Sequence, residues 1–149
     1  GRYLLDLHGE SDREYVYSDA LCNALQVINH LQDCGKDYTE MDRVYLPEPW
    51  LKDAGANVED LSKTEASSGV RNVIDQCLEG TRELLVVADK LPGALKSRRL
   101  AMESAVILKV AHKLVEELSN RDPLAERVEL TKAQYVKCTI WGCVIGLTS

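Results

Sequence analysis

The sequence predicts an all-α protein. Apolar residues recur at steps of three and four over several long segments, and no segment shows the period-two alternation that is typical of strands. With 149 residues, 45% of them apolar and 28% charged, the chain fits one globular domain that is long enough to bury a core. Because there is no internal repeat or low-complexity tract, we expect long helices packed around an apolar core.

The first two helices are expected to be bounded by a glycine and by a capping residue. Residues 2–8 are typical of the end of a helix that Gly9 closes, because glycine readily takes the left-handed conformation. Ser18 or Asp19 would cap the next helix, which continues to about residue 40. Its apolar positions follow a helical period: Ala20, Leu21, Ala24, Leu25, Val27, Ile28 and Leu31.

Prolines are expected to separate the following elements. Pro47 and Pro49 remove backbone donors and predict a turn after the second helix. Residues 66–90 then carry an apolar face with helical spacing, and the Pro-Gly pair at 92–93 would end that helix. Residues 96–119 repeat the same pattern and predict a fourth long helix.

The last helix is expected to be capped by Thr131 and contains the most apolar stretch of the chain, "YVKCTIWGCVIGL" at residues 135–147. This stretch is shorter than the roughly 18 apolar residues of a membrane span. Its length suits a buried or interfacial helix, so we expect peripheral membrane contact at most. The first nine residues lack the charged and apolar regions of a signal peptide.

Charge and cysteine usage narrow the class of protein. The net charge of −6 and the absence of a long basic run argue against sequence-independent nucleic-acid binding. The five cysteines are odd in number and show no CxxC or zinc spacing. This pattern favours buried thiols in a reducing compartment, so we expect a cytoplasmic protein, and association with a membrane surface is compatible with that expectation.

An acidic stripe on the second helix raises the question of function. In "NHLQDCGKDY", residues 29–38, Asn29, Asp33 and Asp37 follow at steps of four, and Gln26 lies one turn earlier. Two carboxylates at this spacing repel each other by roughly 0.2–0.5 kcal/mol unless a cation offsets the charge. Of the basic residues nearby in the helix, only Lys36 is placed to do so.

A solvated helix face is the simplest explanation of such a stripe, and the chain contains a comparison for it. Asp75, Glu79 and Glu83 repeat the four-residue ladder on the third long helix, with Arg71 and Arg82 nearby, and we interpret this second ladder as solvated. The first ladder differs because short neutral oxygen-bearing side chains accompany its carboxylates. Such donors suit Mg²⁺, which completes its coordination with water and substrate phosphates. From the residues alone, a metal site and a solvated face both remain open.

The segment "ALQVINHLQDCGKDYTEMDRVYLP", residues 24–47, resembles the second aspartate-rich motif of squalene and phytoene synthases. The pattern Gln-x-x-Asn-x-x-Gln-Asp-x-x-x-Asp, followed by Arg-x-Tyr-x-Pro, is met at Gln26, Asn29, Gln32, Asp33, Asp37, Arg43, Tyr45 and Pro47. The flanking segments are also similar to that family, so the resemblance covers essentially the whole chain. It implies a helical bundle of the isoprenoid synthase type.

The resemblance also implies roles for these residues. Asn29, Asp33 and Asp37 would hold Mg²⁺, with Gln26 hydrogen-bonding near them. Arg43 would offer a guanidinium fork to the substrate diphosphate, and Tyr45 a hydroxyl at the same rim, so that Asp33, Asp37 and Tyr45 form the catalytic set. For Arg43 and Tyr45, a surface ion pair and a partly buried ring are the simpler alternatives.

Three residues depart from the usual family pattern without removing an implied ligand. They are Cys22 in place of glycine, His30 in place of an apolar residue, and Cys34 in place of a bulky apolar residue.

The implied activity is the Mg²⁺-dependent head-to-head condensation or rearrangement of farnesyl or presqualene diphosphate toward squalene, as in bacterial members linked to hopanoid synthesis. A phytoene or dehydrosqualene synthase is the nearest alternative. A non-catalytic relative that acts as an assembly or interaction protein is an alternative of another class, but it would be expected to have degraded aspartate motifs.

The family also carries a first aspartate-rich motif on an earlier helix, and no convincing equivalent is present here. The sequence therefore predicts that residues 1–149 are the C-terminal part of a synthase-like domain, with the other half missing or supplied by a partner chain. On this interpretation the isolated chain would have negligible synthase activity.

Overall fold

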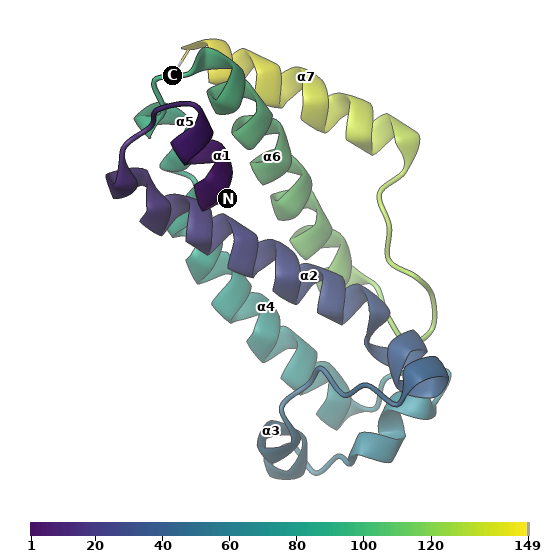
Figure 1. Ribbon diagram of the computed structural model, residues 1–149. Coiled ribbons are helices and arrows are strands. Elements are labelled where there is room, and N and C mark those ends of the chain that lie inside the picture. The colour runs from purple at the N-terminus through teal and green to yellow at the C-terminus, as the bar shows by residue number, and fades with distance from the viewer. Residues whose placement is uncertain (149) are drawn as a thin grey trace. The chain divides into compact units, whose positions relative to one another are not determined.

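The computed structural model describes the backbone of residues 1–148 and the side chains of residues 1–145, and within that range its regular elements are all helices, without strands. Short 3₁₀ helices occur at Asp12–Glu14 and Val58–Ser62. The α-helices (Figure 1) are α1 (Arg2–Leu7), α2 (Tyr15–Met41), α3 (Glu48–Asp53), α4 (Ser68–Ala88), α5 (Leu91–Ala94), α6 (Arg98–Asn120) and α7 (Lys132–Thr148). The all-α prediction is confirmed.

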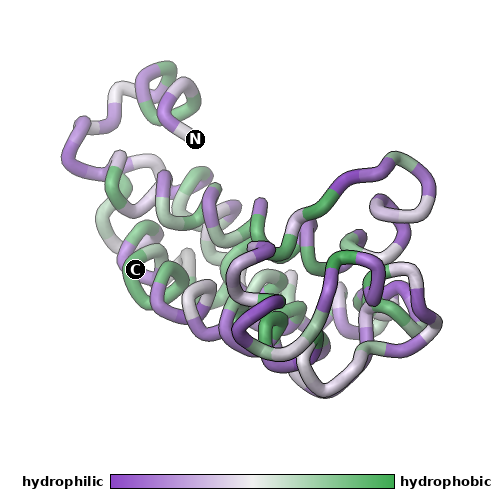
Figure 2. The backbone as a smooth tube through the Cα atoms, turned by 90° about the horizontal axis from the view of Figure 1, so that it is seen from below, coloured by the Kyte–Doolittle hydropathy of each residue, from purple (hydrophilic) through white to green (hydrophobic). Residues whose placement is uncertain are grey.

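The chain forms two compact units, and the boundaries between them fall within α2, α4 and α6 and between Glu129 and Leu130. Unit 1 contains residues 1–26, 82–113 and the chain from Leu130 onward, and unit 2 contains Val27–Thr81 and Leu114–Glu129. Along each long helix, hydrophobic and hydrophilic residues alternate at short intervals, as Figure 2 shows. This is the pattern of helices with one buried face.

In unit 1, small residues and polar caps bring the helices together. The Glu10 carboxylate accepts hydrogen bonds from the backbone N–H groups of Lys96 and Ser97, at 3.0 and 2.7 Å, just before α6 begins. Gly142 lets α7 approach α6, because a Cβ at this position would lie 2.5 Å from the Cα of Val106. The core is formed by Leu5, Ala20, Leu21, Ala24, Leu85, Ala88, Leu91, Leu100, Ala101, Ala105, Leu108, Ala111 and Leu130.

Unit 2 has a core of larger aliphatic side chains and a cation at a helix end. Arg71 of α4 donates to the carbonyl groups of Leu118, Ser119 and Arg121, at 2.9, 3.3 and 3.1 Å, and it pairs with Asp75. A positive group is favourable there because the C-terminal carbonyls of a helix are otherwise unpaired. The core residues are Ile28, Leu31, Cys34, Leu46, Leu51, Ala56, Leu61, Val70, Val73, Ile74, Leu78, Leu114, Val115, Leu118 and Val128.

The predicted start of α2 at Ser18 or Asp19 is wrong. Ser11 is the actual cap, because its hydroxyl accepts from the N–H of Arg13 at 3.2 Å and opens the 3₁₀ turn that leads into α2. Ser18 is buried inside the helix. Asp19 is hydrogen-bonded to Arg2, and this contact lowers the pKa of the carboxyl group.

The prolines do not act only as helix breakers. Pro47 precedes α3 and Pro49 lies in its first turn, where a missing N–H costs nothing because first-turn N–H groups have no partner within the helix. The Pro-Gly pair at 92–93 likewise lies inside the short α5. The predicted turns are therefore short helices, although α2 and α4 do end close to the expected residues.

The cap at Thr131 is confirmed. Its hydroxyl accepts from the N–H of Gln134 at 3.2 Å, and the Gln134 side chain accepts from the N–H of Thr131 at 2.7 Å. This reciprocal pair is a capping box at the start of α7. Within the described residues, no helix is both long and apolar enough to span a membrane.

The expectation of buried thiols is correct for Cys34 and wrong for Cys22. All five cysteines are free; Cys34 is buried, Cys22 is exposed, and the remaining three are partly exposed. Burial raises the pKa of Cys34 to about 12, because the thiolate would lose its hydration. A thiol must ionise to react as a nucleophile.

We therefore expect Cys22, and not Cys34, to be alkylated by iodoacetamide at pH 8 in the folded protein. Peptide mass spectrometry after timed quenching measures both rates, and the same reaction in guanidinium chloride is the control in which both sites react. Equal labelling of Cys34 and Cys22 in the folded state would contradict the burial of Cys34.

Candidate functional site

The stripe on α2 lies on one face of the helix. Asn29 is exposed and Asp33 and Asp37 are partly buried, whereas Ile28 and Leu31 of the same turns are fully buried. Steps of four residues keep the three polar side chains on one side of the helix. Gln26 is exposed one turn earlier on α2 and belongs to unit 1.

The chain reverses direction at the C-terminal end of α2. Asp42 has a φ of 53°, in the left-handed region, and its N–H donates to the carbonyl of Tyr38 at 3.1 Å. The N–H of Arg43 donates to the carbonyl of Asp37 at 3.2 Å. This is a left-handed helix cap with aspartate where glycine is more usual. It directs the following residues back along α2.

The reversal brings Tyr45 onto the acidic stripe. Its hydroxyl donates to Asp37 Oδ2 at 2.6 Å. Its ring stacks on the His30 ring, with centroids 4.1 Å apart and planes within 1°. Tyr45 is partly buried, as the simpler alternative also expected, but its hydroxyl is committed to one of the two candidate carboxylates.

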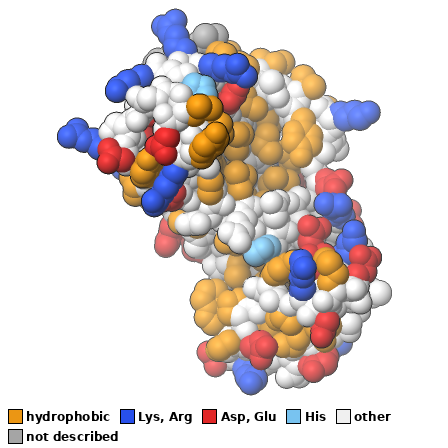
Figure 3. All heavy atoms as spheres, viewed as in Figure 1, with side chains coloured by type: hydrophobic (Ala, Val, Ile, Leu, Met, Phe, Trp, Pro, Cys, Tyr) orange, Lys and Arg blue, Asp and Glu red, His pale blue; other side chains and the backbone are white. Residues whose placement is uncertain are grey.

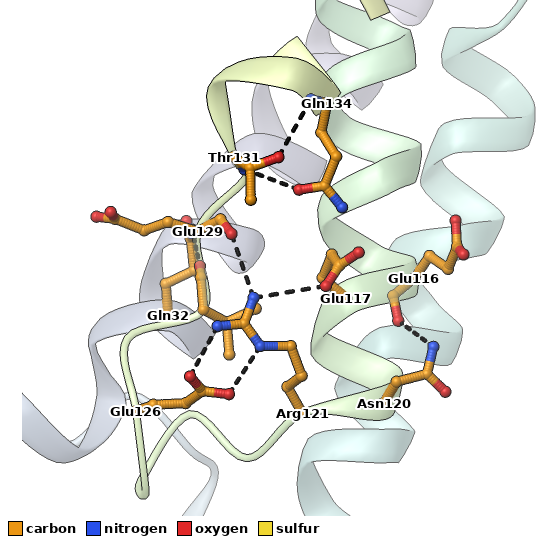
Figure 4. Close-up of polar contacts among 10 residues, drawn as sticks. Gln32, Glu116, Glu117, Asn120, Arg121, Glu126, Glu129, Thr131 and Gln134 are labelled. Carbon is orange, nitrogen blue, oxygen red and sulfur yellow. Dashed lines mark hydrogen bonds and ion pairs between the residues drawn. The ribbon is translucent and has the colours of Figure 1, made fainter. Parts of the chain in front are cut away.

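A connecting segment, residues 121–129, approaches the same helix from a distant part of the sequence. Arg121 organises it by donating to both carboxylate oxygens of Glu126, at 2.8 and 2.9 Å, and to the carbonyl of Glu129 at 3.2 Å (Figure 4). The hydrogen bonds from Arg121 lower the pKa of Glu126. Gln32 of α2 holds the segment by donating to the carbonyl of Val128 at 2.6 Å.

The connecting segment places Arg127 beside Asp33. The Arg127 Nε lies 3.6 Å from Asp33 Oδ1 and 2.9 Å from Glu129 Oε1. Sequence reasoning did not include Arg127 in the site. No local pattern could have found it, because ninety-odd residues separate it from Asp33 and only the folding of the segment onto α2 brings them together.

The other two cations near the stripe behave differently. Lys36 lies 4.0 Å from Glu40, and both side chains are exposed. Arg43 is exposed, and within the described part of the chain its guanidinium makes no hydrogen bond or ion pair. The surface ion pair considered for Arg43 is therefore not formed, and its donors face solvent.

The second acidic ladder confirms the interpretation given to it. Asp75, Glu79 and Glu83 are all exposed, and Asp75 is paired with Arg71. The two ladders have the same spacing but different surroundings: the first lies next to a tyrosine hydroxyl and a distant arginine, whereas the side chains of the second are all exposed.

The donor set on α2 fits Mg²⁺ as an open site. Among the side chains that the structure describes, no group of three or more His, Cys, Asp or Glu could hold a metal ion. Asp33, Asp37 and the Asn29 amide supply oxygen donors only, and a carboxylate that accepts from Tyr45 keeps further lone pairs. Mg²⁺ usually takes one or two carboxylates and fills its octahedron with water and phosphate oxygens. The residues present meet that requirement.

Comparison with known proteins assigns the chain to a family. The profile of the squalene/phytoene synthase family matches residues 1–134. The chain therefore belongs to the squalene/phytoene synthase family, as its motif indicated, and its helices are part of an all-α fold of the isoprenoid synthase type.

Individual relatives agree with this assignment. The chain is 45% identical over 134 residues to a protein named hydroxysqualene synthase from Zymomonas mobilis, covering 90% of this chain and 45% of the relative. It is 45% identical over 136 residues to another of that name from Rhodopseudomonas palustris, covering 91% and 47%. A phytoene synthase from Thermus thermophilus is 35% identical over 85 residues, covering 57% and 29%.

The chain thus spans about half the length of the hydroxysqualene synthases that it matches. No solved structure matches it significantly.

The cap at Asp42 can be tested by substitution. Replacing Asp42 with glycine should leave the free energy of unfolding unchanged or raise it by up to about 1 kcal/mol, because glycine takes a positive φ without steric cost. Asp42→Val should lower it by about 1–2 kcal/mol, because a β-branched side chain clashes in this conformation. Urea denaturation of the two variants compares them directly. If Asp42→Val were as stable as Asp42→Gly, the reversal would not depend on the left-handed residue.

Proposed function

We propose that the intact protein is a Mg²⁺-dependent prenyl transferase that converts farnesyl or presqualene diphosphate to a thirty-carbon product of the squalene series. The proposal rests on one arrangement in particular, the face of α2 on which Asp33 and Asp37 lie beside Tyr45 and Arg127. Family membership supports it, and the names of the relatives from Zymomonas and Rhodopseudomonas favour hydroxysqualene as the product.

Each residue of the site has a distinct role in this proposal. Asn29, Asp33 and Asp37 bind Mg²⁺, which when bound stabilises negative charge on the departing diphosphate. Arg127 and Arg43 donate to diphosphate oxygens, a geometry that guanidinium groups match well. Tyr45 holds the Asp37 carboxylate in one orientation. Gln26, exposed one turn before Asn29, hydrogen-bonds at the edge of the same site.

The balance of the reaction distinguishes the possible products. Ionisation breaks the bond between carbon and the diphosphate oxygen, and the electron pair leaves with the diphosphate. Head-to-head joining of two farnesyl diphosphates gives a cyclopropyl diphosphate with loss of one diphosphate and one proton, and a second ionisation releases the other diphosphate. The final carbocation can then take a hydride, which gives squalene and consumes a reductant. It can instead take the oxygen of water, which releases a proton and gives hydroxysqualene. The second outcome needs no nicotinamide cofactor.

A phytoene or dehydrosqualene synthase remains the second candidate. The match to the phytoene synthase from Thermus thermophilus favours it, but that match is shorter and less similar than the matches to hydroxysqualene synthases. A non-catalytic relative is disfavoured because the motif from Gln26 to Pro47 retains every implied ligand.

We further propose that residues 1–149 supply one side of the diphosphate site and that a second set of carboxylates lies elsewhere, on the rest of a longer chain or on a partner chain. The small donor set on α2, two carboxylates and one amide, supports this division, as does the half-length match to the relatives. On this proposal the 149-residue chain alone turns over no prenyl diphosphate.

The roles of Asp33 and Asp37 predict a loss of activity without a loss of stability. In the intact synthase, Asp33→Asn or Asp37→Asn should lower turnover by on the order of a hundredfold, equivalent to roughly 2.7 kcal/mol of transition-state stabilisation. The melting temperature should stay unchanged or rise slightly, because a few tenths of a kcal/mol of carboxylate repulsion is relieved. The assay follows Mg²⁺-dependent formation of hydroxysqualene without nicotinamide cofactor.

Glu83→Gln is the matched control. Glu83 is the third residue of the exposed ladder on α4, as Asp37 is the third residue of the stripe on α2. The substitution should change neither turnover nor stability. Near wild-type turnover of Asp33→Asn at saturating Mg²⁺ would refute the metal site. A product that forms only with a reductant would refute hydroxysqualene as the product.

We also propose that α7 contacts a membrane surface, where water-insoluble products would be released. Its exposed apolar side chains include Val136, Ile140 and Trp141, with 57%, 59% and 63% of their surfaces accessible. Lys132 and Lys137 lie on the same helix, which carries no acidic residue. Hydrophobic side chains are exposed among lysines and arginines on the molecular surface (Figure 3). An apolar and basic helix of this kind suits the surface of an anionic bilayer.

Vesicle flotation tests this contact. The chain should float with phosphatidylglycerol vesicles at low salt and less with phosphatidylcholine vesicles, and Ile140→Ser with Trp141→Ser should reduce flotation. Val86→Ser, a substitution at an exposed apolar residue of α4, is the control. Equal flotation of the α7 variant and the unaltered chain would exclude α7 as the contact, and so would a complete absence of flotation.

A further inference from the structure

His30 is not one of the residues of the family motif, yet its ring contacts Tyr45, which is hydrogen-bonded to the candidate ligand Asp37. It lies on α2 seven residues before Asp37, so two helical turns place both side chains on the same side of the helix. Its ring is partly buried and parallel to the ring of Tyr45. The same tyrosine donates its hydroxyl to Asp37.

The orientation of the Tyr45 side chain depends on contacts of its ring, because the backbone of Tyr45 is not part of a helix. Residues 42–45 have no regular secondary structure between the end of α2 and the start of α3. The segment is fixed on one side by the hydrogen bond from Arg43 to the carbonyl of Asp37, and on the other by the buried side chain of Leu46. Both contacts are made by neighbouring residues and neither involves the Tyr45 ring. The ring itself stacks in parallel on His30, and its hydroxyl donates to Asp37.

We propose that His30 is a positioning residue, whose ring orients Tyr45 so that the phenol hydroxyl keeps the Asp37 carboxylate turned for metal binding. The proposal rests on the assignment of Asp37 as a Mg²⁺ ligand. It requires no change of charge on the imidazole and no direct contact between His30 and the metal. An aromatic ring of another kind should therefore perform the same task.

The expected effect follows from what hydrogen-bond partners do for metal ligands. Removing a group that orients a ligand typically weakens metal affinity by about tenfold to a hundredfold. Tyr45→Phe removes the hydroxyl and should weaken affinity by about tenfold. His30→Ala leaves the hydroxyl present but free to turn away, so its effect should be smaller, about threefold to tenfold. His30→Phe keeps a stacking ring and should bind the metal nearly as well as the unaltered chain.

The experiment measures Mn²⁺ binding to the 149-residue chain by electron paramagnetic resonance, with inorganic pyrophosphate present as the anion. The variants are His30→Ala, His30→Phe, Tyr45→Phe, His30→Ala combined with Tyr45→Phe, and Asp33→Asn as the test of the metal site itself. Asn23→Ala, at an exposed position on α2, is the matched control, and melting temperatures are recorded for all. If His30 acts only through Tyr45, the double variant should bind Mn²⁺ no more weakly than Tyr45→Phe alone.

The outcomes separate this inference from the proposed function. Weaker Mn²⁺ binding by His30→Ala, recovery by His30→Phe and non-additivity with Tyr45→Phe support the positioning role. If His30→Ala binds Mn²⁺ like the unaltered chain while Asp33→Asn does not bind it, the positioning role is overturned and the metal site stands. Equal weakening by His30→Ala and His30→Phe also overturns it, since a stacking ring would then be insufficient. If Asp33→Asn has no effect either, the metal site itself is wrong.

Discussion

The orientation of α2 is the constraint on which the site depends. Ile28, Leu31 and Cys34 are almost completely buried, and each would lose its apolar contacts if the helix rotated about its axis. Because one helix face is fixed in this way, Asn29, Asp33 and Asp37 must lie on the side that the core leaves open. The apolar residues of unit 2 thus determine the direction of the polar ones, although they take no part in the chemistry.

Two separate segments then stabilise a face that carries like charges. The segment after α2 returns through the left-handed residue Asp42 and brings the Tyr45 hydroxyl to Asp37. The connecting segment between α6 and α7 brings Arg127 toward Asp33, and Gln32 anchors that segment through the carbonyl of Val128. Each carboxylate therefore has a different partner. The pair can remain close together in the protein and still offer lone pairs to a cation.

The comparison of the two acidic ladders shows why spacing alone did not establish a site. Asp75, Glu79 and Glu83 repeat the four-residue spacing of Asp33 and Asp37, but their side chains are exposed. The Arg71 side chain next to Asp75 also donates to the carbonyls at the end of α6. What distinguishes the first ladder is the convergence of Tyr45 and Arg127 on it. That convergence is a property of the folded chain. The family match supports the same conclusion from an independent direction.

The sequence by itself determined the helices, the acidic stripe and the family, because helical periodicity, capping residues and a motif of fixed spacing are local features of the chain. It placed Thr131 correctly as a cap but misplaced the start of α2. In the folded chain Ser11 accepts the capping hydrogen bond, Ser18 is buried within the helix and Asp19 is paired with Arg2. Only the tertiary structure decided that Arg127 lies near Asp33 and that His30 stacks on Tyr45. The physical reason is that both contacts join segments whose relative positions are set by core packing and by a chain reversal. Neither of these can be predicted from the spacing of neighbouring residues.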